Sequence, residues 1–345
     1  MKSRTINISG QWIGGDAPFV IAEIGNNHVG DIERCKELFR VAKGCGVDAV
    51  KIQKRDNRAL FTRELYNSPY VNENSYGKTY GEHREALEFD FEQYVELKAY
   101  CEEIGVTFFA TAFDLRSVDF LEKVGVPCYK IASGDLLNMP LQRYIAGTGK
   151  PIFLSTGGGT YDDVRRAYEA IMPINAQLVI MQCTAAYPAE PKDINLLVIA
   201  EYKKRFTDAV IGFSDHFIGK VFGPPAYVLG ARVFEKHFTL HRWWQGTDHH
   251  FSLEPDDMKK YVRDINNIRL GMSDRKLFLD CEAKPLYKMG KKLVVSRKMT
   301  VGEILTVSDI RIVSPNDGLP PYELERMLGK KLLCDMEEEE NLRWE

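Results

Sequence analysis

The chain has 345 residues, of which 44% are hydrophobic and 28% charged, as in an ordinary soluble globular protein. Its formal net charge of −3 argues against a nucleic-acid partner, because binding a phosphate backbone needs a basic surface. No run reaches the roughly 18 apolar residues of a membrane helix, and the N-terminus lacks the apolar core of a signal peptide. Seven cysteines without any CxxC spacing indicate reduced thiols. We therefore expect a cytoplasmic protein without membrane association.

Short apolar runs alternate with amphipathic stretches along most of the chain. Strands are predicted at 19–25, 49–53, 107–111, 128–133, 151–156, 178–183, 209–215 and 231–238. Helices are predicted near 31–43, 86–104, 115–124, 137–147, 160–173, 192–206, 219–230 and 254–270. Most strand candidates are continuously apolar, as strands buried on both faces should be. The alternation predicts a (β/α)8 TIM barrel, with a doubly wound open sheet as the alternative. The first turn, AEIGNNHVG, lacks the GxGxxG that such an open sheet usually shows.

Two segments depart from this alternation. The polar and aromatic stretch 54–85 predicts an extended loop over the barrel mouth, which is a candidate substrate lid. From about 285, short β-branched runs, Gly and Pro turns and one helical stretch near 321–329 predict a small β-rich module. We therefore expect a catalytic barrel domain at 1–280 and a second domain at 285–345.

Polar and charged residues gather at the carboxyl ends of the predicted strands. They are Glu23, Lys51, Thr111, Lys130, Ser133, Ser155, Tyr187, Ser214, Asp215, His216, Glu235 and His237. Each one alone has an ordinary alternative as a satisfied polar group at a strand end. In a barrel, however, these ends meet at the face where active sites lie. Together they predict one pocket.

One subset of these residues suits an anionic ligand. Two lysines and three serines from four predicted strands supply ammonium and hydroxyl donors for a phosphate with a neighbouring carboxylate. They are Lys51, Lys130, Ser133, Ser155 and Ser214. The glycine triplet at 157–159 adds backbone N–H groups at a helix start, a weak signal by itself.

A second subset suits a divalent transition metal. His216 and His237 end the last two predicted strands, and Asp215, Glu235 and Asp248 are close in sequence. A lone histidine is more simply a hydrogen-bonded core residue, but the pair with nearby acids favours a metal. The HExxH motif of many metal-dependent hydrolases is missing, which counts against hydrolysis.

Seven motifs carry a resemblance to a known family. They are AEIGNNHVG at 22–30, VKIQ at 50–53, KIASGD at 130–135, LSTGG at 154–158, QCTAAYP at 182–188, GFSDH at 212–216 and FEKHFT at 234–239. In order and spacing the chain resembles the sialic acid synthase family, which includes N-acetylneuraminate, legionaminate and pseudaminate synthases. The tail from about 285 is similar to the antifreeze-like (SAF) domain of these enzymes.

The resemblance implies a metal-dependent condensation of phosphoenolpyruvate with an aldose to a 3-deoxy-2-keto sugar acid and phosphate. It implies that phosphoenolpyruvate is held by Lys51, Thr111, Lys130, Ser133, Ser155 and Ser214. Manganese, or another divalent metal such as magnesium or cobalt, is expected on His216 and His237 as a Lewis acid. Glu23 is expected to act with Lys51 and Lys130 in catalysis, and Asp135, Tyr187 and Asp248 are expected to contact the sugar. A domain-swapped homodimer is also implied.

The departures from the family pattern cluster on the sugar side. Ser314 replaces an Arg that recognises the sugar's N-acyl group, and Ala185, Phe217, Ala112 and Asp135 also differ from the usual residues. We therefore hypothesise a remodelled acceptor, with neutral drift as the alternative. Two other functions stay open at this point. One is an octulosonate- or heptulosonate-type synthase that uses a phosphorylated sugar, and the other is a catalytically silent sugar-binding homologue.

Overall fold

The computed structural model describes residues 4–344. The chain forms two compact units, Met1–Met272 and Ser273–Glu345. Each unit has its own hydrophobic core. The first unit holds every predicted strand-end residue.

The first unit is a closed parallel barrel of eight strands. The strands are β3 (Phe19–Gly25), β4 (Ala49–Lys54), β5 (Thr107–Ala112), β6 (Tyr129–Ile131), β7 (Ile152–Ser155), β8 (Leu178–Cys183), β9 (Val210–Asp215) and β10 (Val233–His237). They pair in chain order, and β10 closes the barrel on β3. The predicted (β/α)8 barrel is confirmed, and the open sheet is wrong because β3 has a partner on both sides.

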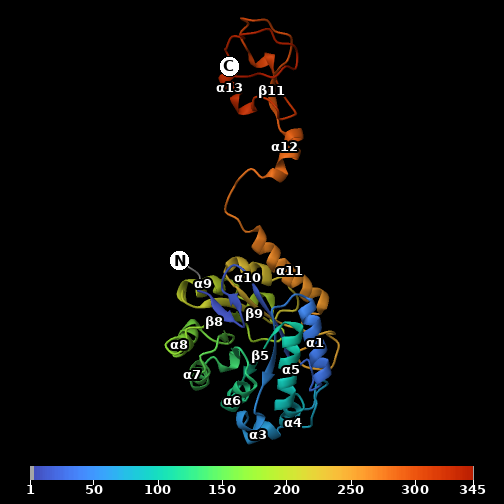
Figure 1. Cartoon of the computed structure of the whole chain (residues 1–345), viewed down its shortest axis with the longest axis vertical. Coiled ribbons are helices and arrows are strands. Elements are labelled where there is room, and N and C mark those ends of the chain that lie inside the picture. The colour runs from blue at the N-terminus through green and yellow to red at the C-terminus, as the bar shows by residue number, and fades with distance from the viewer. Residues whose placement is uncertain (1–3, 345) are drawn as a thin grey trace. The chain divides into compact units, whose positions relative to one another are not determined.

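Helices cover the outside of the barrel, where all but the last connect successive strands (Figure 1). They are α1 (Ile32–Gly44), α5 (Phe91–Ile104), α6 (Leu115–Val124), α7 (Met139–Gly147), α8 (Tyr161–Ile171), α9 (Leu197–Arg205), α10 (Gly223–Leu229) and α11 (Pro255–Gly271). Local sequence explains several boundaries. Asp90 caps the start of α5, and Gly105 ends that helix with φ of 68°, a conformation that glycine adopts readily.

The inside of the barrel changes from apolar to polar along the strands. A lower layer includes Phe19, Ile21, Phe109, Phe153 and Val179, all buried. The side chains two residues further along several strands are polar, because alternate residues of a strand face the same side.

An N-terminal hairpin packs against this apolar layer. Its strands, β1 (Ile6–Ile8) and β2 (Gln11–Ile13), contribute Ile6, Ile8 and Ile13 to the same cluster. This hairpin was not predicted from the sequence. It strengthens the apolar floor, so the polar cavity is reached from the carboxyl ends of the strands.

The segment 54–85 is more ordered than the predicted loop. It contains three short helices, α2 (Asn57–Leu60), α3 (Arg63–Asn67) and α4 (Tyr80–Glu85). Hydrogen bonds join it to the loop after β10, for example from Tyr76 Oη to the Gln245 carbonyl at 2.6 Å. It therefore contributes to the wall at the carboxyl end of the barrel.

The second unit is small and β-rich, as predicted. It contains the helix α12 (Ala283–Met289), an antiparallel pair of β11 (Lys292–Val295) and β12 (Ile310–Val313), and α13 (Leu324–Met327). Its core is made of Leu293, Val295, Met299, Leu305, Met327, Leu332, Met336 and Leu342.

Two arginines of this unit, Arg297 and Arg311, are candidates to replace the guanidinium missing at Ser314. Arg297 pairs with Asp309 and Glu303, and Arg311 pairs with Glu339. Both guanidiniums are therefore already occupied by carboxylates of their own unit. Ser314 itself accepts a hydrogen bond from Lys291 Nζ at 2.6 Å.

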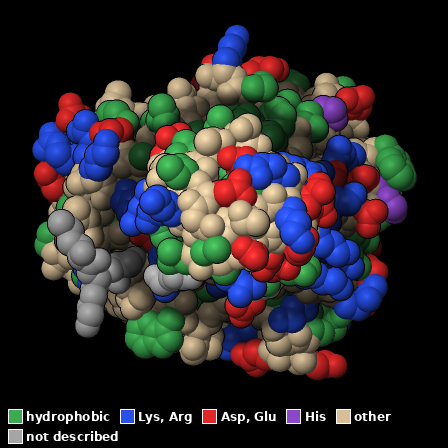
Figure 2. All heavy atoms as spheres, turned by 90° about the horizontal axis from the view of Figure 1, so that it is seen from above, with side chains coloured by type: hydrophobic (Ala, Val, Ile, Leu, Met, Phe, Trp, Pro, Cys, Tyr) green, Lys and Arg blue, Asp and Glu red, His purple; other side chains and the backbone are tan. Residues whose placement is uncertain are grey.

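The surface and the cysteines show no unusual feature. On the face in Figure 2, basic and acidic side chains are interspersed. Cysteines in the described part of the chain are all free, and most of them are buried. Within residues 4–344 there is no helix of the length and apolarity that a bilayer span requires.

Candidate active site

A cavity of about 440 Å³ lies at the carboxyl ends of the strands. The predicted residues on its lining are Glu23, Lys51, Thr111, Lys130, Ser133, Ser155, Tyr187, Ser214, His216, His237 and Asp248. Glu235, also predicted, lies on the lining as well. Asp135 and Asp215 are the exceptions among the candidates. Asp135 lies in a short 3-10 turn, where its carboxylate accepts a hydrogen bond from Asn138 at 2.9 Å. The structure thus brings together all but two of the candidates.

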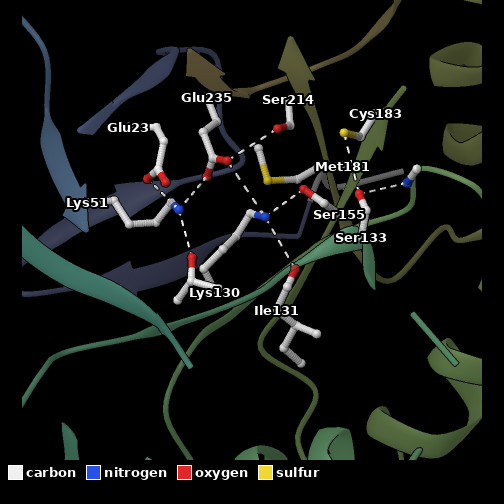
Figure 3. A network of polar contacts seen from close by, with 12 residues as sticks. Glu23, Lys51, Lys130, Ile131, Ser133, Ser155, Met181, Cys183, Ser214 and Glu235 are labelled. Atoms are coloured by element: carbon white, nitrogen blue, oxygen red, sulfur yellow. Dashed lines mark hydrogen bonds and ion pairs between the residues drawn. The ribbon is translucent and has the colours of Figure 1, made fainter. Parts of the chain in front are cut away.

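Two buried lysines and two buried glutamates form the floor of the cavity (Figure 3). Lys51 Nζ lies 2.5 Å from Glu23 Oε2 and 3.9 Å from Glu235 Oε2. Lys130 Nζ lies 3.7 Å from Glu235 Oε1. The lysines also donate to hydroxyls, Lys51 to Thr111 at 2.7 Å and Lys130 to Ser155 at 2.6 Å. Their ammonium groups are therefore fixed in position from several strands.

Burial and the lysines set the charge of the two glutamates. Burial raises the pKa of Glu23, and Lys51 only partly offsets that effect. Burial also opposes ionisation of Glu235, but Lys130 and Lys51 outweigh it and lower the pKa of Glu235. Burial lowers the pKa of Lys130. Glu235 therefore favours its anionic form, whereas Glu23 holds a proton more readily.

The two predicted metal ligands lie beside each other at the carboxyl ends of the neighbouring strands β9 and β10. The ring centroids of His216 and His237 are 5.5 Å apart. His216 Nδ1 lies 2.7 Å from the Thr184 carbonyl, so Nδ1 carries the proton and Nε2 presents its lone pair. Burial lowers the pKa of His237 to about 3, and its buried Nδ1 has no hydrogen-bond partner among the described residues. Both imidazoles are thus suited to bind a divalent metal.

The part of the chain that the structure describes offers this metal the two histidines. Within residues 4–344 no group of three His, Cys, Asp or Glu side chains has the arrangement of a metal site. Beside the pair, Cys183 Sγ lies 3.8 Å from His216 Nδ1 and Asp248 Oδ2 lies 3.9 Å from His237 Nδ1. The remaining coordination positions would be open to water and substrate, as in catalytic rather than structural sites.

Asp215 and Glu235, expected near the histidines, have other partners. Asp215 forms a fully buried ion pair with Lys236 at 2.8 Å, while Glu235 lies between the two lysines. Strand alternation explains the difference for Asp215, because Ser214 and His216 face inward and the residue between them faces outward. Asp215 is therefore not part of the cavity.

The part of the cavity that contains Tyr187 and Asp248 is aromatic and polar. The Tyr187 ring lies 4.2 Å from the His216 ring, and the residue is 57% exposed. The side chain of Asp248 is 15% exposed, and His237 and a hydrogen bond from Thr247 lower its pKa against the effect of desolvation. An exposed aromatic face beside a fixed carboxylate is a suitable surface for a polyhydroxylated ligand.

The cavity also contains residues that the sequence analysis did not single out. They are Asn26, Gln53, Arg55, Arg84, Phe113, Ala132, Gly134, Cys183 and Thr247. Gln53 follows Lys51 by two positions on β4, so strand alternation alone would have found it. Arg84 lies on α4 in the segment 54–85, so a search for polar residues at the ends of strands could not have found it.

Comparisons with known proteins agree with this geometry. The sequence profile of the NeuB family matches residues 38–276, and that of the SAF domain matches residues 292–345. A barrel with a polar cavity at its carboxyl end and an appended SAF domain defines the class. The chain belongs to the NeuB family.

Individual relatives cover nearly the whole chain. The chain is 40% identical to human N-acetylneuraminate-9-phosphate synthase over 96% of its own length and 94% of that protein. It is 32% identical to N,N'-diacetyllegionaminic acid synthase of Legionella pneumophila over 95% and 94% of the two chains. Among solved structures, the N-acetylneuraminic acid synthetase of Leptospira borgpetersenii matches with a TM-score of 0.71 and 28% identity, covering 82% of this chain and 95% of that one.

Proposed function

We propose that this protein condenses phosphoenolpyruvate with an aldose to give a 3-deoxy-2-keto sugar acid and phosphate. The observation that carries the proposal is the arrangement of Lys51 and Lys130 in a buried layer beside the His216–His237 pair. Names of relatives support the same chemistry, since they are synthases of nonulosonic acids. The reaction is a carbon–carbon bond-forming transfer.

Phosphoenolpyruvate fits the cationic floor. Its phosphate and carboxylate require several donors, and Lys51, Lys130 and the hydroxyls of Ser133, Ser155 and Ser214 all line this part of the cavity. Gly157 N donates to Ser133 Oγ at 3.0 Å, which fixes that hydroxyl in place. In the cavity without ligand, Glu23 and Glu235 balance the lysines, and the anionic substrate would take over part of that role.

A divalent metal, most simply manganese, would be held by His216 and His237. When bound, it supplies a Lewis acid that polarises and orients the aldehyde of the open-chain sugar. The tautomer of His216 and the unpaired Nδ1 of His237 support this assignment.

The covalent steps follow from the substrates. C3 of phosphoenolpyruvate forms a bond to the aldehyde carbon, whose oxygen takes up a proton. Water adds at C2 and loses one proton, which balances the proton taken up by the aldehyde oxygen. The C2 hydroxyl then becomes the ketone as the C2–O bond to phosphate breaks, and its proton leaves with the phosphate. Glu23 has a raised pKa and contacts Lys51, so it is placed to stabilise positive charge at C2 or to transfer a proton there.

The proposed function also includes the kind of sugar that acts as the acceptor. The Ser314 substitution favours an acceptor other than an N-acylated hexosamine bound through an arginine, and Tyr187 and Asp248 would contact its hydroxyls.

Because sialic acid synthases place the SAF domain of one subunit over the barrel of another, we propose a domain-swapped homodimer. Free thiols throughout the described chain support a cytoplasmic location.

Phosphate release tests this function. Manganese-loaded protein is incubated with phosphoenolpyruvate and a panel of mannose, N-acetylmannosamine, their 6-phosphates, arabinose 5-phosphate and diacetamido-hexoses. We expect aldose-dependent release that chelator abolishes. His237→Ala should abolish release and lower the bound metal measured by plasma mass spectrometry, whereas exposed His250→Ala should retain both. Release without any aldose, or metal content unchanged in His237→Ala, would contradict the proposal.

The two remaining alternatives predict different outcomes in the same assay. Release only with arabinose 5-phosphate or a related short phosphosugar would favour the octulosonate type. No release with any acceptor, combined with protection against heat by phosphoenolpyruvate, would favour a silent binding protein.

A further inference from the structure

The turn after β3 sends one side chain across to the end of β10. Asn27 is 1% exposed and lies in this turn, outside the lining of the cavity. Its Nδ2 donates two hydrogen bonds, one to the carbonyl oxygen of Phe238 at 2.9 Å and one to Ser252 Oγ at 3.0 Å. The amide therefore joins three segments at the carboxyl end of the barrel, namely the turn after β3, the end of β10 and the loop before α11.

The first hydrogen bond acts next to a candidate metal ligand. Phe238 directly follows His237 in the chain and is fully buried. A carbonyl oxygen can only accept a hydrogen bond, so the nitrogen of the Asn27 amide, and not its oxygen, must face Phe238. Removing the amide would leave this buried carbonyl without its donor and loosen the chain beside His237.

The second hydrogen bond leads to Asp248. Ser252 is also 1% exposed, and its Oγ donates its single proton to the backbone carbonyl of Asp248 at 2.6 Å. The same hydroxyl oxygen can then accept from Asn27, so the hydrogen bonds run in one direction from amide to hydroxyl to carbonyl. Asn27 thus holds the backbone of Asp248 through Ser252.

The turn that carries Asn27 also contacts the side chain of Asp248. A hydrogen bond from the backbone N–H of Asn26 reaches the Asp248 carboxylate. The turn itself is anchored by the buried His28, whose Nδ1 accepts a hydrogen bond from the Gly30 N–H at 3.0 Å. The loop after β10 is therefore supported by a turn that is itself fixed in place.

Asn27 supports two functional side chains that come from different segments. His237 ends β10, Asp248 lies in the loop after that strand, and their Nδ1 and Oδ2 atoms lie 3.9 Å apart. Because one amide reaches both segments, a shift of this amide would change the separation of the two side chains. Lys51 and Lys130, which form the floor, lie on β4 and β6, and the two hydrogen bonds of the Asn27 amide do not reach them.

We propose that Asn27 is a positioning residue that sets the separation between the candidate metal ligand His237 and the acceptor-binding Asp248. For the reaction, this inference rests on the proposed function. The hydrogen bond to Phe238 orients His237 for the metal, and the hydrogen bond to Ser252 orients Asp248 for the sugar. Loss of a residue that orients a metal ligand changes metal affinity or activity by about 10- to 100-fold. The effects of the two hydrogen bonds should be separable by mutation.

The test compares two variants with a matched control. Asn27→Ala removes both hydrogen bonds, and Ser252→Ala removes only the connection to Asp248. The control is Asn175→Ala, because Asn175 is a buried asparagine away from the cavity lining whose Nδ2 donates to the Lys150 carbonyl at 2.7 Å. The measurements are unfolding in urea, manganese affinity by calorimetry, and kcat and KM for phosphoenolpyruvate and for the aldose of the panel that gives the highest phosphate release.

We expect the two variants to differ in a defined way. Asn27→Ala should weaken manganese binding and lower kcat by about 10- to 100-fold each and raise KM for the aldose, while KM for phosphoenolpyruvate stays within about two-fold of the parent value. Ser252→Ala should raise KM for the aldose by about 3- to 10-fold and keep the manganese affinity. Asn175→Ala should lower the free energy of unfolding but keep the manganese affinity and the kinetic constants.

The inference is overturned if Asn27→Ala has the same manganese affinity and kcat as Asn175→Ala. It is also overturned if KM rises equally for phosphoenolpyruvate and the aldose, because that result would show a general loosening of the barrel. If Asn27→Ala does not fold, Ser252→Ala decides the question, and an unchanged KM for the aldose would contradict the proposal.

Failure of the proposed function gives a different result. Neither the parent protein nor any variant would then release phosphate with an aldose. Asn27→Ala would still bind manganese less tightly than the parent and than Asn175→Ala, because the hydrogen bond beside His237 acts on the metal ligand whatever the reaction is.

Discussion

Lys51 Nζ lies 2.5 Å from Glu23 Oε2, and both side chains are at most 3% exposed. Such a pair is seldom retained for stability alone, because desolvation of two charges offsets much of their attraction. Here it holds an ammonium group inside the barrel, in reach of a second carboxylate on Glu235. The pair therefore keeps a cation ready for an anionic substrate in a site closed below by apolar side chains.

Replacing Glu23 by glutamine tests whether the reaction needs the carboxylate at this position or only a side chain of this size. Glu23→Gln keeps the size of the side chain but removes the carboxylate, and we expect phosphate release to fall by about 10²- to 10⁴-fold. Calorimetry should still detect phosphoenolpyruvate binding, since Lys51 remains. The exposed Glu33→Gln, whose partner Lys36 lies 2.9 Å away, is the matched control. Near-parental turnover of Glu23→Gln would exclude a catalytic role.

Asp215 is expected to matter for folding and not for chemistry. Asp215→Asn leaves Lys236 buried without its carboxylate, so the free energy of unfolding in urea should fall by about 3–5 kcal/mol. The folded fraction should keep its bound metal. Loss of metal with unchanged stability would instead place Asp215 in the metal site.

Buried histidines should make stability depend on pH. Burial lowers the pKa of His28 to about 3 and that of His83 to about 4, and each Nδ1 accepts a backbone N–H. Unfolded histidine titrates near 6.5, so below that pH the unfolded chain binds protons that the folded chain excludes. The contribution of these histidines to the free energy of unfolding is therefore fully present above about pH 6.5 and is lost as the pH decreases toward 4.

The contribution of one histidine can be isolated. Each excluded proton contributes a slope of up to about 1.4 kcal/mol per pH unit in urea unfolding between pH 6.5 and 4. His28→Asn should flatten the curve by about that amount, whereas the exposed His250→Gln should leave it as in the parent. An unchanged slope in His28→Asn would show that His28 is not excluded from protonation.

Ser314 offers a test of acceptor remodelling. Ser314→Arg restores the residue type that recognises the N-acyl group in similar enzymes, so the ratio of kcat/KM for N-acetylmannosamine 6-phosphate over mannose 6-phosphate should rise. One charge-assisted hydrogen bond corresponds to about 10- to 100-fold. A ratio equal to that of the parent would mean that this position no longer contacts the acceptor.

Much of the barrel could be predicted from sequence because its signals are local. Strands buried on both faces are continuous apolar runs, and lysine or histidine at their ends has no structural reason other than a site. Asp215 was predicted to lie near the histidines because it directly precedes His216 in the sequence. Successive residues of a strand face opposite sides, so Asp215 and His216 lie on opposite faces of the barrel wall.

Other features depend on tertiary contacts. The strands Ile6–Ile8 and Gln11–Ile13 are short, and only their packing against the barrel floor stabilises them. Arg84 reaches the cavity because the segment 54–85 folds into helices tied to the loop after β10. No periodicity in the sequence indicates that path. The hydrogen bond that Asp135 accepts from Asn138, a neighbour in the same turn, is likewise a feature of the folded chain.

The most direct test of the central claim is mass spectrometry of the product. Manganese-loaded protein is given phosphoenolpyruvate and mannose 6-phosphate or N-acetylmannosamine 6-phosphate, and phosphate is measured in parallel. We predict one product with the mass of the aldose plus phosphoenolpyruvate plus water minus phosphoric acid, formed in equal amount to the phosphate released. Phosphate release accompanied by pyruvate and unchanged sugar would contradict a condensation at this site.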